Sequence, residues 1–377
     1  MWYNHSMNQL NLTSENPVSH LAEALLPWFR ENARDLPWRK TTDPYRIWVS
    51  EIMLQQTRVA AVLGYYARFM AAFPSVEALA GAPEEALMKQ WEGLGYYSRA
   101  RNLQKAAKIV AGNGGRFPDT YEGLLALPGV GEYTAGAIAS AAFGLRTAAV
   151  DGNVLRCVAR LTDCHDDISA PAVKKAVRER VQAAMPEGEA DIRIFNQATM
   201  ELGATVCVPN GPPRCGICPV RDFCLGRLRG TAESLPVKAP KKQRRTEEKT
   251  VFLLLRGGKA ALRKRPDAGL LAGLWEFPNT EGALDEAAAA EVLHTWGLEA
   301  KNWRSRLAAK HIFTHVEWHM TGYVLEVSGL GPDGLVWVDR KGLAEHAVPS
   351  AFARYCQEAR RLLGADGELP PERKEEP

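Results

Sequence analysis

The chain has 377 residues, more than one ordinary hydrophobic core accommodates, so we expect two domains joined by a linker. Hydrophobic residues make up 46% and charged residues 24%, as in soluble globular proteins, and no apolar run is long enough to span a membrane. The net charge of +3 requires any nucleic-acid-binding surface to be local. The N-terminal sequence has no secretory signal and the cysteines are clustered, which predicts a protein of the reducing cytoplasm.

The first part of the chain, residues 18–230, is predicted to be mostly helical, because Ala-, Leu- and charge-rich segments alternate with Gly and Pro. Asp43 followed by Pro44 is typical of a helix start, and we expect that helix to run through residues 45–63. Glu51 lies inside it among apolar neighbours. A glutamate there lies either on a solvated edge or in a pocket, where burial would raise its pKa and make it a general acid.

Two neighbouring segments carry groups suited to nucleic acid. Gln56 and Thr57 offer uncharged hydrogen-bonding groups for base edges. Residues 94–101 mix tyrosine with arginine, which suits stacking on bases and contact with phosphates. A core tyrosine beside a solvated basic helix explains the second pattern equally well.

A glycine-rich turn, LPGVG at 127–131, separates two helical patterns. Gly129 and Gly131 allow a tight hairpin whose backbone N–H groups lie at a helix N-terminus and bind phosphate, although a plain helix–helix turn is an equal alternative. Asp151 follows twenty residues later, in front of the helical run 153–161, where it is expected as the N-cap. A carboxylate held by backbone N–H groups should stay ionised and could stabilise a nearby cation.

Four of the seven cysteines lie within residues 207–224, with the spacing C-x7-C-x2-C-x5-C: Cys207, Cys215, Cys218 and Cys224. Four thiolates on a loop rich in Pro and Gly can hold zinc or an iron–sulfur cluster, and the spacing alone does not choose between them. Cys157, Cys164 and Cys356 are expected to be free thiols.

Residues 231–249 gain charge and proline and lose periodicity, which predicts a linker. The pattern then changes to a predicted β-hairpin around a Gly-Gly turn, two further strands and one helix, at residues 251–264, 322–327, 335–338 and 285–296, respectively. The second domain is therefore expected to be a smaller α+β unit at 250–365, followed by a disordered tail at 371–377.

The hairpin, the later aspartate and the four-cysteine loop together resemble the helix–hairpin–helix DNA glycosylases related to endonuclease III. Five further motifs, within a match that covers about residues 20–228, are similar to the A/G-specific adenine DNA glycosylases (the MutY family): LPWR at 36–39, WVSEIMLQQT at 48–57, GLGYYSRARNL at 93–103, VDGNV at 150–154 and FNQATMELGA at 195–204. The second domain resembles the Nudix-like domain of that family through LLAGLWEFP at 270–278 and HIFTHVEWH at 311–319.

The resemblance implies a base-excision-repair enzyme that hydrolyses the N-glycosidic bond of adenine mispaired with 8-oxoguanine or guanine. Glu51 matches the general acid that protonates adenine N7. Asp151 matches the carboxylate that stabilises the oxocarbenium ion, as in other two-carboxylate glycosidases. Tyr133 and Asn153 match positions that support the transition state.

Bifunctional relatives carry a lysine at the position of Tyr133, so the resemblance implies little or no lyase activity. An endonuclease III-like pyrimidine-lesion glycosylase/lyase is the alternative. A DNA-binding protein without catalysis is disfavoured, because a scaffold has no need of both Glu51 and Asp151.

Other matched residues concern the substrate. The pocket that receives the flipped adenine is matched by Trp38, Arg39, Leu54 and Gln197, and the wedge in the duplex by Gln56, Thr57, Leu94 and Tyr96. The loop that reads 8-oxoguanine is matched by Phe313, Thr314 and His315, and the phosphate-binding hairpin by Gly129, Val130 and Gly131. Relatives often carry serine in place of Thr314, so a hydroxyl is kept. The partner implied is double-stranded DNA, bound by a monomer in the nucleoid region of a bacterial cytoplasm.

The resemblance also implies one [4Fe–4S] cluster on the four cysteines. The family's usual first gap is six residues, and the seven found here fall in a loop that can absorb one more. An active Nudix hydrolase needs an Arg-led group of carboxylates for magnesium, whereas this chain offers only four scattered acids: Glu281, Asp285, Glu286 and Glu291. The second domain is therefore expected to be a recognition module.

Overall fold

The computed structural model describes residues 16–239 and 243–364, which divide into two compact units. The first contains the described residues up to Gly81 and from Asn102 to 239, and the second contains Ala82–Arg101 and the described residues from 243 onward. The segment 82–101 thus departs from the predicted border, which placed all of 18–230 in one domain. Hydrogen bonds hold it there: Lys89 Nζ donates to the carbonyl of His346 (3.2 Å) and Glu92 Oε1 accepts from the Val348 N–H (3.1 Å).

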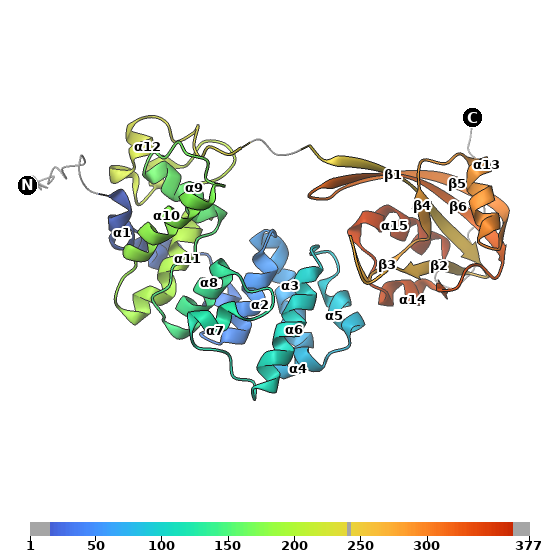
Figure 1. Cartoon of the computed structure of the whole chain (residues 1–377), viewed down its shortest axis with the longest axis horizontal. Coiled ribbons are helices and arrows are strands. Elements are labelled where there is room, and N and C mark those ends of the chain that lie inside the picture. The colour runs from blue at the N-terminus through green and yellow to red at the C-terminus, as the bar shows by residue number, and fades with distance from the viewer. Residues whose placement is uncertain (1–15, 240–242, 365–377) are drawn as a thin grey trace, which may run out of the picture. The chain divides into compact units, whose positions relative to one another are not determined.

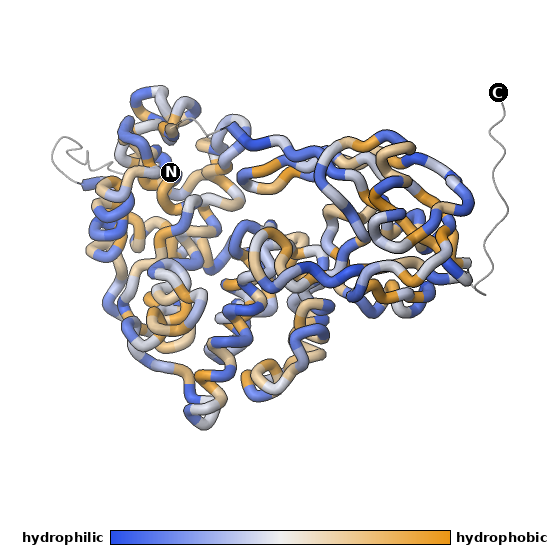
Figure 2. The backbone as a smooth tube through the Cα atoms, turned by 45° about the vertical axis from the view of Figure 1, so that its right-hand side comes forward, coloured by the Kyte–Doolittle hydropathy of each residue, from blue (hydrophilic) through white to orange (hydrophobic). Residues whose placement is uncertain are grey.

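The first unit is helical, as predicted (Figure 1). Hydrophilic and hydrophobic stretches alternate along its helices, as expected where each helix buries one side (Figure 2). Its helices are α1 (Leu21–Asn32), α2 (Pro44–Leu54), α3 (Val59–Ala72), α4 (Val76–Gly81), most of α6 (Ser98–Gly112), α7 (Tyr121–Leu125), α8 (Glu132–Phe143), α9 (Gly152–Leu161), α10 (Pro171–Ala183), α11 (Glu189–Thr205) and α12 (Leu225–Leu228). No helix among the described residues is long and apolar enough to cross a membrane.

The helix predicted over 45–63 is in fact two helices. It begins as expected, since Asp43 Oδ1 accepts from the Tyr45 N–H (2.9 Å), but α2 ends at Leu54. Gln56 follows in the left-handed region with φ +58°, and α3 then starts at Val59. The polar residues at 55–58, Gln-Gln-Thr-Arg, mark this break, which lies next to the pocket described below.

The second unit has a seven-stranded mixed sheet, with β1 and β6 parallel and the other pairs antiparallel. Its elements are α5 (Glu84–Trp91), β1 (Arg245–Arg256), β2 (Lys259–Lys264), β3 (Trp275–Glu276), β4 (Asn279–Glu281), α13 (Glu286–Thr295), β5 (Leu298–Ile312), β6 (Val316–Gly329), β7 (Leu335–Val338), α14 (Arg340–Glu345) and α15 (Ala353–Leu362). The predicted hairpin, the two further strands and the helix are all present. β3, β4, β5, α14 and α15 were not predicted.

The central strand β1 is buried on both faces. Val251, Leu253 and Leu255 pack in the core that contains α15, whereas Phe252 and Leu254 pack in the core that contains α13. Figure 1 shows these helices on different sides of the sheet. This alternation follows from the two-residue period of a strand.

The segment predicted as a linker at 231–249 is largely structured. Leu235 is buried on the first unit, where its carbonyl accepts from Arg160 Nε (2.9 Å), and β1 already begins at Arg245. Charge and proline content therefore overstated the length of the connection. The tail expected to be disordered at 371–377 lies outside the described residues.

Candidate active site

A pocket of about 820 Å³ opens in the first unit, within the range typical of small-molecule sites. Many of the predicted site residues line it: Trp38, Arg39, Glu51, Leu54, Gln56, Thr57, Tyr133, Asp151, Asn153 and Gln197. They come from the short 3₁₀ helix Pro37–Arg39, α2, the α2–α3 break, α8, the start of α9 and α11. Segments more than 150 residues apart in sequence therefore meet here.

Glu51 is 9% exposed, which excludes the solvated-edge alternative. Tyr133 Oη donates to Glu51 Oε2 (2.8 Å), and it also lies 3.0 Å from the sulfur of Met200. Burial raises the pKa of Glu51 to about 7, and the negative charge of Asp151 adds to this, while the Tyr133 hydrogen bond and Arg39 oppose it. Glu51 can therefore hold a proton near neutral pH, as a general acid must.

Asp151 caps α9, as predicted, and both of its oxygens are used. Oδ1 accepts from the N–H groups of Asn153 (2.9 Å) and Val154 (2.8 Å), and Oδ2 accepts from Asn153 Nδ2 (2.7 Å). The sequence suggested that such donors would decide its ionisation. Burial is in fact the larger influence and raises the pKa of Asp151, against these hydrogen bonds and the charge of Arg156. Of these two carboxyls, the buried Glu51 and the partly buried Asp151, only Asp151 has several N–H donors that favour its charged form.

The sequence did not point to Glu201, a charged residue that also lines this pocket. Its carboxylate is fully buried and accepts from Nε (2.7 Å) and a terminal nitrogen (2.7 Å) of Arg34 and from Arg39 (2.7 Å). Burial alone would raise its pKa, but the two guanidinium groups outweigh it and lower the pKa of Glu201 to about 2. This pairing fixes the guanidinium of Arg39, one of the predicted pocket residues. The sequence signal that could have indicated Glu201 is an acidic residue in α11 between two apolar ones, Met200 and Leu202.

The hairpin at 127–131 connects α7 and α8 as predicted, but its two glycines differ. Gly129 has φ +78°, and a Cβ there would lie 2.7 Å from the Cβ of Asn102. Gly131 has an ordinary φ of −95°, and an added Cβ would meet nothing within 4 Å. Only Gly129 is therefore required by the turn, with Val130 buried between the two. No side chain among the described residues caps α8, so its first N–H groups are available to an anion.

The remaining predicted DNA contacts belong to the second unit and are not among the residues that line the pocket. Leu94 is buried, whereas Tyr96 is half-exposed and adopts φ +47°. Phe313, Thr314 and His315 form the turn between β5 and β6, and Thr314 Oγ1 lies 2.9 Å from Tyr96 Oη. The predicted wedge tyrosine and the predicted reading loop are therefore neighbours.

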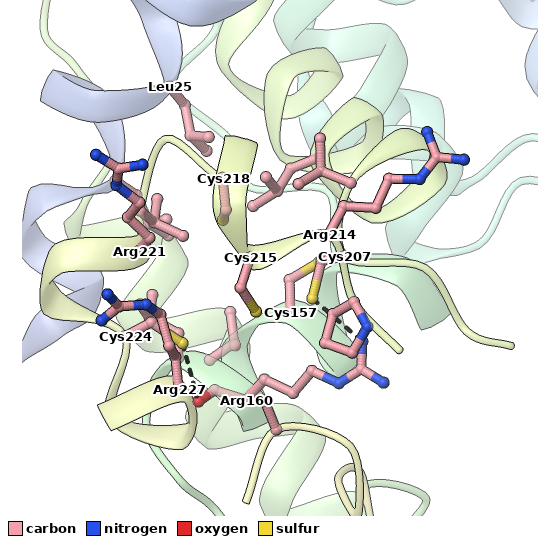
Figure 3. A pocket seen from close by; sticks show the side chains of 18 of the residues that line it. Leu25, Cys157, Arg160, Cys207, Arg214, Cys215, Cys218, Arg221, Cys224 and Arg227 are labelled. Atoms are coloured by element: carbon pink, nitrogen blue, oxygen red, sulfur yellow. Dashed lines mark hydrogen bonds between the residues drawn. The ribbon is translucent and has the colours of Figure 1, made fainter. Parts of the chain in front are cut away.

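The four clustered cysteines line a second, mainly apolar cavity of the first unit, shown in Figure 3. Among the described residues, no three histidine, cysteine or acidic side chains form a ready group of metal ligands. The donor set nevertheless suits a thiolate-bound metal centre, because four thiols face one cavity and Arg160 donates to the sulfur of Cys207 (3.3 Å).

Arg156, a second residue that the sequence did not point to, joins the two sites. It is buried in α9 and donates to Asn153 Oδ1 (3.0 Å) on one side. On the other side it donates to the carbonyls of Gly203 (2.8 Å) and Cys207 (3.0 Å). The residue that holds Asp151 is thus connected to the start of the cysteine loop.

The geometry agrees with the families that the chain resembles. Residues 49–183 match the HhH-GPD superfamily base excision DNA repair protein family, and residues 250–358 match the NUDIX domain. The adenine DNA glycosylase of Homo sapiens is 36% identical over 404 aligned positions, which cover 89% of this chain and 73% of that protein. That of Buchnera aphidicola subsp. Baizongia pistaciae is 36% identical and covers 68% and 72%. A solved thermostable thymine-DNA glycosylase has a TM-score of 0.50 at 29% identity and covers 56% and 97%.

Proposed function

The chain belongs to the adenine DNA glycosylase family, and from this premise we propose that it removes adenine paired with 8-oxoguanine or guanine in duplex DNA. It is a base-excision-repair glycosylase, a hydrolase that acts on N-glycosyl bonds. The observation that carries the finer proposal is that two carboxyls line one pocket, the buried Glu51 with a pKa of about 7 and the partly buried Asp151 with three N–H donors.

The proposed reaction divides the work between these carboxyls. Protonated Glu51 donates its proton to adenine N7, which makes the base a neutral leaving group. Asp151, as a carboxylate, stabilises the positive charge that develops on the sugar, and water completes the hydrolysis. Tyr133 orients the acid, and Asn153 orients Asp151 through its amide.

The flipped adenine is proposed to lie against Trp38, Leu54 and Gln197. Trp38 is buried and packs edge-on against Tyr66 with ring centroids 5.2 Å apart, so its position is fixed. Arg39 supplies the fixed positive charge of the pocket through its pair with Glu201. Such an arrangement suits a base held outside the stack.

We propose that the enzyme does not cleave the DNA strand. A lyase of this type needs an amine to attack the sugar, and no lysine is among the described residues that line the pocket. Tyr133 occupies the corresponding position, and its pKa is raised well above the usual value by burial and by Glu51. A neutral, buried phenol is a poor nucleophile.

For the metal, we propose that Cys207, Cys215, Cys218 and Cys224 hold one [4Fe–4S] cluster per chain. Such a cluster would cross-link the loop after α11 and so support the DNA-binding unit. The protein is proposed to act as a monomer on double-stranded DNA.

One assay tests the activity. The protein is incubated with duplexes that contain A:8-oxoguanine, A:G or thymine glycol, and each product is examined with and without alkali. We expect cleavage only after alkali and only at the adenine strand. Cleavage without alkali, or at thymine glycol, would support the bifunctional alternative.

The matched variant is Glu51→Gln, which keeps the shape of the side chain but has no proton to give. We expect it to bind the A:8-oxoguanine duplex with wild-type affinity and to release adenine at least about a hundredfold more slowly. Wild-type turnover by this variant would remove Glu51 from the mechanism.

A further inference from the structure

A fifth thiol lines the four-cysteine cavity. Cys157 lies on α9, three residues after the end of the motif VDGNV at 150–154, and it is buried. Its thiol hydrogen-bonds to the sulfur of Cys207, and Figure 3 shows these two side chains next to each other on one wall of the cavity. The catalytic pocket does not include Cys157, and neither does the proposed set of cluster ligands.

We propose that Cys157 and Cys207 form a reversible disulfide when Cys207 is not bound to metal, and that this bond prevents reassembly of the metal centre. Arg160 donates to the Cys207 sulfur from the same helix, which holds that sulfur beside Cys157. The disulfide itself follows from this contact, whereas its effect on assembly rests on the proposed cluster.

The chemistry balances with a peroxide as the oxidant. The Cys207 sulfur attacks one oxygen of hydrogen peroxide, the O–O bond breaks, and a sulfenic acid and water result. The Cys157 sulfur then attacks the sulfenic sulfur, the S–S bond forms, and a second water leaves with the thiol proton. The two thiols are oxidised by two electrons and the peroxide is reduced. A dithiol reverses the reaction.

The other two cysteines outside the four-cysteine loop serve as comparisons for Cys157. Cys164, in the turn after α9, is partly exposed, and its thiol lies 3.9 Å from an oxygen of Asp166. Cys356 belongs to the second unit. Cys164 therefore provides a matched control on the same stretch of chain, since it is more accessible to an oxidant and its thiol contacts Asp166 rather than one of the four loop cysteines.

The test uses the full-length protein, stripped of iron with a chelator and treated with hydrogen peroxide. A non-reducing protease digest is analysed by mass spectrometry. We expect one linked peptide pair that joins Cys157 to Cys207, with a mass about 2 Da below that of the two thiol peptides. Cys164→Ser should give the same pair, and Cys157→Val should lose it. A linkage of Cys207 to another loop cysteine, with Cys157 still alkylatable, would overturn the proposal.

A second readout separates this proposal from that of the cluster. Iron and sulfide are added anaerobically, and the absorbance near ~400 nm is followed. Peroxide-treated wild type should remain colourless until a dithiol is added and should then regain the absorbance. In treated Cys157→Val the sulfenic acid on Cys207 lacks this partner thiol and is oxidised further to the irreversible sulfinic acid, so the absorbance should not return even with the dithiol. Equal recovery in both would contradict the gating role. If reduced, untreated wild type also failed to gain absorbance, the proposed cluster would fail, but the disulfide would still be judged by the linked peptide.

Discussion

Opposing interactions determine the pKa of a single residue, Glu51. Burial raises its pKa to about 7, and the hydrogen bond from Tyr133 works in the opposite direction because it favours the charged form. In the proposed mechanism only protonated Glu51 acts. Since its protonated fraction falls as pH rises through the pKa, we expect the single-turnover rate of adenine release to drop about tenfold per pH unit above about 7.

Tyr133→Phe tests this balance. Without the phenol that stabilises the carboxylate, the pKa of Glu51 should rise further, and the alkaline limb of the pH–rate profile should move to higher pH. The measurement is the same single-turnover profile. Tyr121→Phe, on α7 and outside the pocket lining, is the control and should leave the limb in place. An unmoved limb in Tyr133→Phe would mean that another group sets it.

Within a single element, the hairpin before α8 needs one of its glycines far more than the other. Gly129→Ala forces a side chain into the left-handed region and against Asn102, so we expect it to lower the free energy of unfolding by about 2–4 kcal/mol. Gly131→Ala has open space and an ordinary φ and should cost less than about 1 kcal/mol. Denaturant unfolding of both variants measures the difference. Similar losses would show that the contact with Asn102 is not a constraint.

At the scale of the whole molecule, substrate choice is proposed to depend on the second unit. The Thr314 hydroxyl is kept at the tip of the β5–β6 turn. If it contacts 8-oxoguanine, Thr314→Ala should reduce the ratio of the A:8-oxoguanine to the A:G rate about fivefold, which corresponds to one hydrogen bond of about 1 kcal/mol. Thr314→Ser keeps the hydroxyl and should keep the ratio. A loss in both variants would point to shape rather than hydrogen bonding.

The division into units also limits how that role can be tested. Residues 82–101 group with the second unit, and Leu235 packs on the first, so a truncation at the predicted linker would disturb both. Point variants avoid this problem. They are therefore the better test of lesion reading in this chain.

Local rules in the sequence determined a large part of this protein. The caps Asp43 and Asp151, the Gly129 turn and the β1–β2 hairpin were all predictable, because capping, turn geometry and strand period act over a few residues. The order of the motifs indicated the family for the same reason, since they can be recognised without knowing which surfaces meet.

Only the tertiary structure decided how deeply these side chains are buried and which partners they contact. Only packing buries Glu51 and so raises its pKa, and only packing brings Glu201 to Arg34 and Arg39, more than 160 residues away in sequence. The contact of Cys157 with Cys207 arises in the same way, from a helix and a loop fifty positions apart. Burial and charge pairing depend on distances in space, which the spacing of residues along the chain does not specify.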